Sequence, residues 1–292
     1  MSRFVFLTFN GLSFGAVYAA VALALVLIWR TTRVLNFAQG AMAMATAYVA
    51  ISVSQATDSY WLGFAAALAA GVVLGAIVQL TAFRTAESMP PLNTIVVGVG
   101  LLIVMEAVVG MIYGIGYRDF PASFDTQTYS LGSTALFSDQ DIFTVVSVLG
   151  LMLVLAALLT WTPSGLRMRA SAFAPEIARL LGVRVSRMLT LGWALAGLVG
   201  ALAGMLVIPS GLGLYPQAMD GVFVLGFTAA VVGGLDSPVG AVVGGIGTGL
   251  ALSYASGYLG SDLTQIAALA LLLVVLLARP SGLFSGTEAR RV

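Results

Sequence analysis

The chain has 292 residues and a net charge of +1; 60% of its residues are hydrophobic, 9% are charged, and its mean hydropathy is +1.03. These values are typical of a polytopic helical membrane protein, because no soluble domain could bury so much apolar surface. The chain contains no cysteine and no histidine, which excludes disulfides, the usual zinc and haem ligands and histidine acid–base catalysis. We therefore expect a single all-α transmembrane domain over residues 1–292 that needs no cofactor or metal and binds no nucleic acid.

Apolar segments of membrane-spanning length follow one another along the whole chain. The predicted segments are 4–29, a segment that begins near Asn36, 61–83, 94–116, 142–162, 188–208, 221–234, 238–255 and 263–278. A turn at Met89, Pro90 and Pro91 precedes the fourth. The segment 221–234 is short for a crossing, so we expect about 8–9 transmembrane segments, depending on whether it crosses or re-enters.

The second segment opens with polar residues, since Asn36, Gln39 and Gly40 enter it together. Polar amides are costly in lipid, so we expect a broken or re-entrant helix whose freed backbone groups face protein or a water-filled cavity. The two amides either line a translocation path or only satisfy the broken backbone.

The fourth segment carries Glu106 near its middle, the only carboxylate that we place near mid-bilayer. An uncompensated charge there costs about 2.5 to 3.5 kcal/mol, so the side chain is expected to be neutral or to face other helices and water. It is either a pathway residue that contacts a substrate ammonium or a protonated acid bonded to a neighbouring helix. We expect no close pair of acids within the membrane.

Basic residues, all of them arginine, decide the predicted topology. Of the 13, only Arg3 and Arg118 fall on one side. The rest fall on the other side: Arg30, Arg33, Arg84, Arg167, Arg169, Arg179, Arg184, Arg187, Arg279, Arg290 and Arg291. This pattern predicts a cytoplasmic loop at 163–187 and an external loop at 117–141. With nine passes, the N-terminus is external and the C-terminus cytoplasmic.

The arginine-rich loop contains the signals of a short helix. Pro175 suits a first helical position, Glu176 follows in the first turn, and Gly182 supplies a left-handed stop. The predicted helix has about two turns and is roughly 10 Å long. Helical spacing places three apolar residues on one face, suited to a partner's groove: Ile177, Leu180 and Leu181.

Glycines at four-residue spacing recur in the apolar segments and predict close helix packing. The pairs are Gly11 and Gly15, Gly71 and Gly75, Gly110 and Gly114, Gly200 and Gly204, and Gly240 and Gly244. A glycine-broken region around Gly233 and Gly234 echoes the polar break near Asn36. Broken helices in corresponding positions of two halves indicate a translocation path.

Four motifs, in order, resemble those of the branched-chain amino acid ABC transporter permeases, and more closely the H-type subunit. They are NFAQG at Asn36 to Gly40, the coupling segment MRASAFAPEIARLLGV, the run VVGGLDSPVGAVVGG, and the ending ARPSGLF with Ser285 inserted before Gly286. Within the second, Glu176, Ile177, Ala178 and Gly182 resemble the EAA-xxx-G loop of ABC importer permeases, with Ile177 in place of an alanine. The distal part of that loop pattern is not matched at Gly192 and Leu195.

The resemblance implies a subunit that pairs with a second related permease, two cytoplasmic ATP-binding subunits and an external solute-binding protein. It implies a multi-pass location in the bacterial cytoplasmic (inner) membrane. The chain has no GxxxxGK[ST] loop and no lysine, so it is not expected to be an enzyme, and ATP hydrolysis would occur elsewhere. The expected ATPase-coupling residues are Arg169, Glu176, Ala178, Leu181 and Gly182. The expected pathway residues are Asn36, Gln39, Gly40, Glu106, Gly233 and Gly234.

Three other functions stay open. Related permeases carry urea or short amides, and a pathway conveys little about its substrate. An ion-coupled secondary transporter or channel could use Glu106 as its coupling site. An integral-membrane enzyme is less favoured, because the chain lacks histidine, cysteine and lysine.

Overall fold

The computed structural model describes the chain except residues 1, 87–90, 122–123, 125–127, 132–133 and 285–292. The first elements are α1 (Ser2–Thr32), α2 (Gln39–Thr57), α3 (Tyr60–Val78), the π-helical turn η1 (Gln79–Phe83), α4 (Arg84–Ala86), α5 (Pro91–Tyr113), β1 (Thr128–Leu131) and β2 (Thr134–Ser138). The second group is α6 (Asp139–Trp161), α7 (Pro163–Phe173), α8 (Pro175–Leu180), α9 (Val185–Val207), the π-helical turn η2 (Ile208–Leu212), α10 (Asp220–Gly233), α11 (Pro238–Leu259), the 3₁₀ turn η3 (Ser261–Leu263) and α12 (Thr264–Ala278). The predicted turn at Met89 and Pro90, the tail arginines Arg290 and Arg291, and the insertion at Ser285 and Gly286 lie outside the described residues.

The predicted helical membrane fold is confirmed. Seven helical segments in the described part of the chain are long and apolar enough to cross a bilayer: 3–32, 60–83, 92–113, 139–161, 185–212, 238–259 and 261–278. The two other predicted segments differ from these. The helix α10 is shorter than a full crossing. The helix α2 has 19 residues but is less apolar, because it begins with Gln39 and carries Ser52, Ser54, Gln55 and Thr57 towards its end.

The segment around α10 connects opposite ends of the bundle. At one end, the Gln140 side chain at the start of α6 donates to the Leu206 carbonyl near the end of α9, at 3.1 Å. At the other end, Asp236, just after α10, pairs with Arg33 and accepts a hydrogen bond from Trp29 at the end of α1. The chain between Leu206 and Asp236 therefore crosses the bundle, which favours the crossing over the re-entrant alternative.

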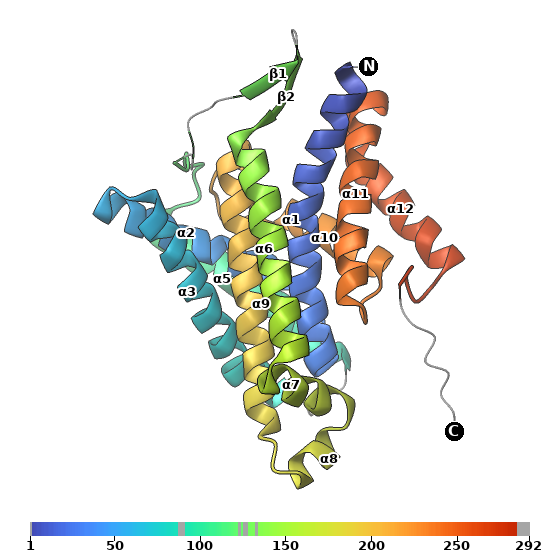
Figure 1. Ribbon diagram of the computed structural model, residues 1–292. Helices are drawn as coiled ribbons and strands as arrows, with labels where there is room; N and C mark the ends of the chain where they lie inside the picture. Colours follow the sequence, from blue (N-terminus) through green and yellow to red (C-terminus); the bar gives the residue numbers. More distant parts are fainter. Residues whose placement is uncertain (1, 87–90, 122–123, 125–127, 132–133, 285–292) are drawn as a thin grey trace.

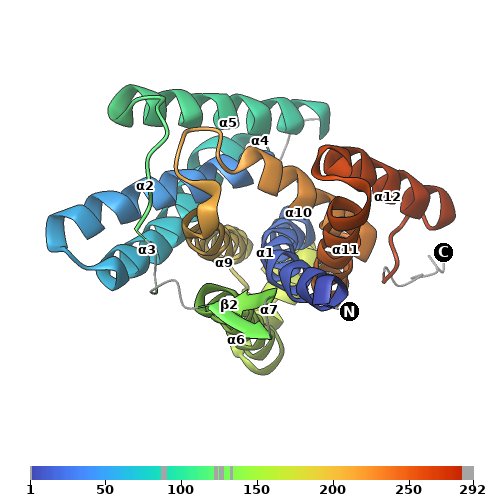
Figure 2. The same cartoon turned by 90° about the horizontal axis from the view of Figure 1, so that it is seen from above.

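The helix α1 forms the centre of the bundle, with α6, α9, α10 and α11 around it (Figures 1 and 2). Of the apolar window of α1, 89% is buried, against 11% for α5 and α12. In Figure 2, α5 and α6 lie on opposite sides of the molecule. Outer helices with mostly exposed apolar side chains are expected to face lipid or another subunit.

Glycines create close helix contacts at four of the five predicted pairs. The exception is Gly110 and Gly114, because a Cβ added to Gly110 would meet nothing nearer than 3.5 Å and Gly114, with a φ of +84°, has open space around it. A Cβ added to Gly15 of α1 would lie 3.0 Å from the Ile246 Cα of α11. A Cβ added to Gly197 of α9 would lie 3.0 Å from the Gly71 carbonyl carbon of α3. Backbones at this separation leave no room for a side chain, so these glycines are packing residues.

The predicted external loop contains a structure that the hydropathy pattern did not indicate. The antiparallel strands β1 and β2 form a hairpin in which Tyr129 faces Phe137, with their rings 5.0 Å apart. A capping box between Ser138 and Asp141 then starts α6. A hydrogen bond with the Asp139 carboxylate raises the pKa of the Tyr129 hydroxyl above its usual value.

Candidate functional site

The predicted coupling loop lies at the end of the bundle opposite the hairpin and the N-terminus (Figure 1). It contains two helices, α7 and α8, where the sequence had predicted only the second. Thr162 caps α7 by accepting a hydrogen bond from the Gly165 N–H at 3.1 Å, and Pro163 occupies the first turn. This Thr-Pro signal at the end of α6 was overlooked because the arginines of α7 indicate a solvated loop.

The short helix α8 begins and ends as predicted. Pro175 stands at its first position with Glu176 beside it. Gly182 adopts a left-handed φ of +80°, and its N–H donates to the Arg179 carbonyl at 3.0 Å. Only a residue without a Cβ adopts this conformation freely, so Gly182 fixes where α8 stops.

The side chains of this region divide into a buried anchor and an exposed apolar surface. Ala178 is 2% exposed, so it packs inward and is not available to a partner. Four large apolar side chains are between 60% and 88% exposed, and we call them the coupling patch: Phe173, Ile177, Leu180 and Leu181. All five arginines of this region, including Arg169, are exposed, as is Glu176. Large exposed apolar side chains in a segment that also exposes charged residues are typical of a protein–protein contact.

The polar break at the start of α2 is fully buried and internally satisfied. The Asn36 Nδ2 donates to the Gln39 Oε1 at 3.0 Å, and the Asn36 Oδ1 accepts from the Ala38 N–H at 3.1 Å. The Gln39 Nε2 donates to the Ala196 carbonyl of α9 at 3.0 Å. These amides hold a broken helix start against α9, which is the structural alternative left open by the sequence. Their assignment to a pathway stays a prediction.

The glycines of the predicted pathway also have packing roles. A Cβ at Gly40 would lie 3.0 Å from the Phe223 Cβ of α10. Gly233 lies against the backbone of Gly240 in α11, and its carbonyl accepts a hydrogen bond from the Phe284 N–H at 3.1 Å. The Leu283 N–H donates to the Val232 carbonyl at 2.9 Å. The segment 282–284 therefore packs against the end of α10 and against Gly234. These close contacts are sufficient to explain why glycine occupies positions 233 and 234.

Glu106 has partners that no sequence pattern revealed. It lies on α5 seven residues before Tyr113, nearer the hairpin end than the predicted mid-bilayer position. The Gln217 Nε2 donates to its Oε2 at 3.4 Å, whereas its Oε1 is buried without a hydrogen-bond partner among the described residues. The Asp220 carboxyl lies beside it, close enough for the two acids to interact electrostatically. The expectation of no close acid pair was wrong, because α10 brings Asp220 to α5 from 114 residues along the chain.

The same side of α5 carries a second polar group about two helical turns farther on. The Tyr113 hydroxyl bonds the Ser52 hydroxyl at 2.8 Å, and its ring lies 4.7 Å from that of Tyr48. Arg118 contacts the Tyr113 carbonyl and covers its ring. Polar contacts therefore continue from Glu106 towards the end that bears the hairpin.

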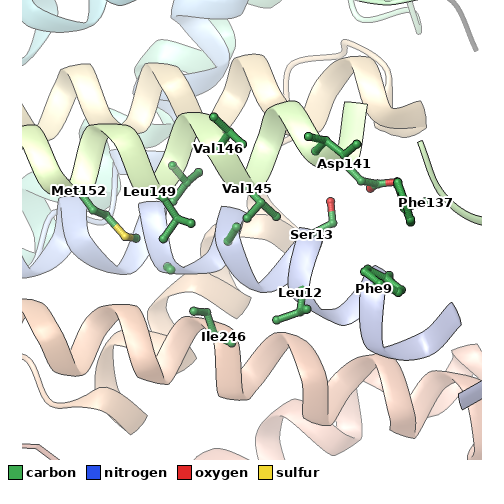
Figure 3. Close-up of a pocket in the computed structure, with 14 residues that line it drawn as sticks. Phe9, Leu12, Ser13, Phe137, Asp141, Val145, Val146, Leu149, Met152 and Ile246 are labelled. Carbon is green, nitrogen blue, oxygen red and sulfur yellow. The ribbon is translucent and has the colours of Figure 1, made fainter. Parts of the chain in front are cut away.

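A cavity of about 440 Å³ lies elsewhere, between α6 and α11 with α1 as its floor (Figure 3). Its walls are apolar apart from Ser13 and Asp141, and none of the predicted pathway or coupling residues lines it. A neighbouring cavity of about 380 Å³ has mixed polar walls and shares Ser13 and Asp141 with the first. These two cavities are distinct from both predicted sites.

Comparison with known proteins gives one consistent family. Residues 7–277 match the family described as "Branched-chain amino acid transport system / permease component". The chain is 29% identical to the high-affinity branched-chain amino acid transport system permease protein LivH of Salmonella typhimurium, over 97% of this chain and 96% of that protein. It is 27% identical to BraD of Pseudomonas aeruginosa over the same shares.

Solved structures of lower sequence identity support the fold. PsaBC from Streptococcus pneumoniae, in complex with an Fab, gives a TM-score of 0.51 at 14% identity, covering 93% of this chain and 91% of that chain. An inward-facing ABC transporter of the metal-chelate type also gives 0.51, at 18% identity, covering 94% and 85%. At this identity the likeness concerns the arrangement of helices alone.

Proposed function

Because the chain belongs to the family of branched-chain amino acid transport system permease components, we propose that it forms the path by which branched-chain or similar small amino acids cross the bacterial inner membrane. As a permease of this ABC transport family it is a non-catalytic, multi-pass subunit that works with ATPase and solute-binding partners. We further propose the composition: a second related permease, two cytoplasmic ATP-binding subunits and one external binding protein.

The coupling patch is the observation that carries this proposal. Apolar side chains as exposed as Leu180 and Phe173 are expected to be covered by a partner. The chain itself has no lysine and no phosphate-binding loop, so it needs an external source of energy. An ATPase groove that accepts α8 supplies both the cover and the drive.

A movement of α8 can be transmitted through neighbouring helices into the bundle. Only residues 181–184 separate α8 from α9, and α9 packs against α1 and α3. The Gln39 hydrogen bond to Ala196 ties the broken start of α2 to the same helix. Displacement of α8 by closing ATPases would move α9, and with it α2, between two access states.

For the pathway we propose the polar group formed by Glu106, Gln217 and Asp220. Two neighbouring carboxyl groups provide oxygen acceptors, able to carry negative charge, for the ammonium group of an amino acid, and the Gln217 amide provides a further polar contact. A neutral substrate such as urea would gain less from this charge. The acid pair therefore favours amino acids over the amide alternative.

Uptake into vesicles tests the function. The chain is co-reconstituted with the second permease, the ATPases and the binding protein encoded beside it. Uptake of leucine, isoleucine, valine and urea is then followed with and without ATP on the side of the membrane that bears the ATPases. We expect ATP-dependent uptake of the branched-chain amino acids. Uptake driven by an ion gradient without ATP would reject an ABC importer. ATP-dependent uptake of urea alone would retain the importer and reject the substrate class.

A further inference from the structure

The apolar cavity between α6 and α11 is an elongated groove along the outside of the bundle. Leu12 and Ala16 of α1 form part of its floor, Val145, Leu149 and Met152 of α6 form one wall, and Ile246 of α11 lies on the other (Figure 3). The helices α6 and α11 both pack on α1, and Ala16 of α1 is among the residues that line the groove between them. The groove thus runs along part of the largely buried central helix.

The length of the groove matches one leaflet of a bilayer. From Asp141 to Met152 the wall formed by α6 spans twelve residues, and the eleven helical steps between them cover about 16 Å. This is about half of the hydrocarbon thickness of roughly 30 Å. The groove begins at Phe137 and Asp141, beside the hairpin, and ends near the middle of α6.

The end of the groove beside the hairpin continues into the polar cavity. That cavity is lined by amides and hydroxyls, including Asn10, Gln140, Thr144 and Ser210, and it shares Ser13 and Asp141 with the groove. Asp141 is the only charged residue among its lining residues in the described part of the chain. A polar, negatively charged chamber above an apolar channel fits an amphipathic molecule that carries an ammonium group.

We propose that these two cavities bind one phospholipid of the leaflet that faces the hairpin. One acyl chain lies along α1 between α6 and α11, and an ethanolamine headgroup occupies the chamber at Asp141. With the positive-inside topology this is the outer leaflet. Phosphatidylethanolamine is selected over phosphatidylglycerol, because the described lining of the chamber offers a carboxylate to the ammonium and no arginine to an anionic headgroup.

The position of the groove argues for a lipid over a second subunit. It opens on the α6 side, whereas α5, which carries Glu106 of the proposed pathway, lies on the opposite side of the bundle (Figure 2). The lipid site depends neither on the family assignment nor on the proposed transport function. If the lipid proposal fails, the proposed transport function is unaffected, and the reverse also holds.

Native mass spectrometry of the full chain tests the site. The protein is purified in mild detergent and mixed with phosphatidylethanolamine or phosphatidylglycerol of identical acyl chains. Val145→Trp fills the groove, and Val154→Trp is the matched control, because Val154 is an exposed valine of α6 that does not line it. We expect retained phosphatidylethanolamine to fall about tenfold in Val145→Trp, as a bulky ring occupies the site, and to stay unchanged in the control.

Three results would overturn the proposal. The first is equal retention of lipid by Val145→Trp and Val154→Trp, and the second is equal retention of the two headgroups by the unmodified chain. The third is a dimer that Val145→Trp alone dissociates, which would make the groove a contact between copies. If Val145→Trp does not fold, the unmodified chain still tests the proposed lipid site. It should retain long-chain phosphatidylethanolamine and release phosphatidylethanolamine with about six carbons per acyl chain, because the short chains make too few apolar contacts.

Discussion

Leu180→Ala is expected to weaken ATPase binding without weakening the fold. Leu180 is 88% exposed in the chain alone, so nearly all of its side chain is available to a partner. The substitution removes three carbons, each worth about 0.8 kcal/mol when buried. Allowing for incomplete burial at the interface, we expect a loss of about 2 kcal/mol, or roughly a 30-fold rise in Kd.

The measurement is a titration of the purified permease in lipid nanodiscs with its ATPase subunits, followed by thermal unfolding of the permease alone. Because Leu180 makes few contacts within the chain, unfolding should change by less than about 0.5 kcal/mol. Leu153→Ala is the matched control, since Leu153 is a leucine of similar exposure in the membrane-spanning part of α6. Its Kd should equal that of the unmodified chain.

A Kd that rises less than about threefold would refute the assignment of the coupling patch, because so small a change is below the value of even one buried methylene group. A rise accompanied by an equal loss in thermal stability would refute it as well. In that case Leu180 would support the fold of the loop and not the contact.

Three further predictions concern the coupling helix, the acid pair and the glycine contacts. Gly182→Pro should abolish co-purification of the ATPases while the protein stays in the membrane, because proline cannot adopt a φ of +80° and loses the N–H that closes α8; normal stoichiometry in a pull-down would contradict this. Glu106→Gln should insert normally and reduce amino acid uptake about tenfold, and an unchanged uptake rate would return Glu106 to a structural role. Gly75→Val should lower the free energy of unfolding by about 1–3 kcal/mol, because its added atoms meet the Trp193 backbone of α9. Gly100→Val should leave the free energy of unfolding unchanged, because the space around Gly100 is open. Equal losses in the two variants would show that helix packing is not the cause.

Hydropathy predicted the helices well because the bilayer dictates both their length and their composition. The same logic predicted the break at Asn36 and Gln39, since uncovered backbone in lipid needs polar partners. The Pro175 and Gly182 signals placed α8 correctly because helix ends depend on local backbone preferences. The sequence did not predict contacts between distant segments, because local backbone preferences do not encode them. Asp220 reaches Glu106 only through the packing of α10, and the pairing of Tyr129 with Phe137 depends on the register of the hairpin.

The burial of α1 has a consequence for biogenesis. This helix precedes in chain order the helices α6, α9, α10 and α11 that finally enclose it. During synthesis, lipid must therefore solvate a surface that later becomes the protein interior. Its apolar character on every side suits both surroundings, so the ribosome can deliver the core of the protein first and the membrane can hold it until its neighbours arrive.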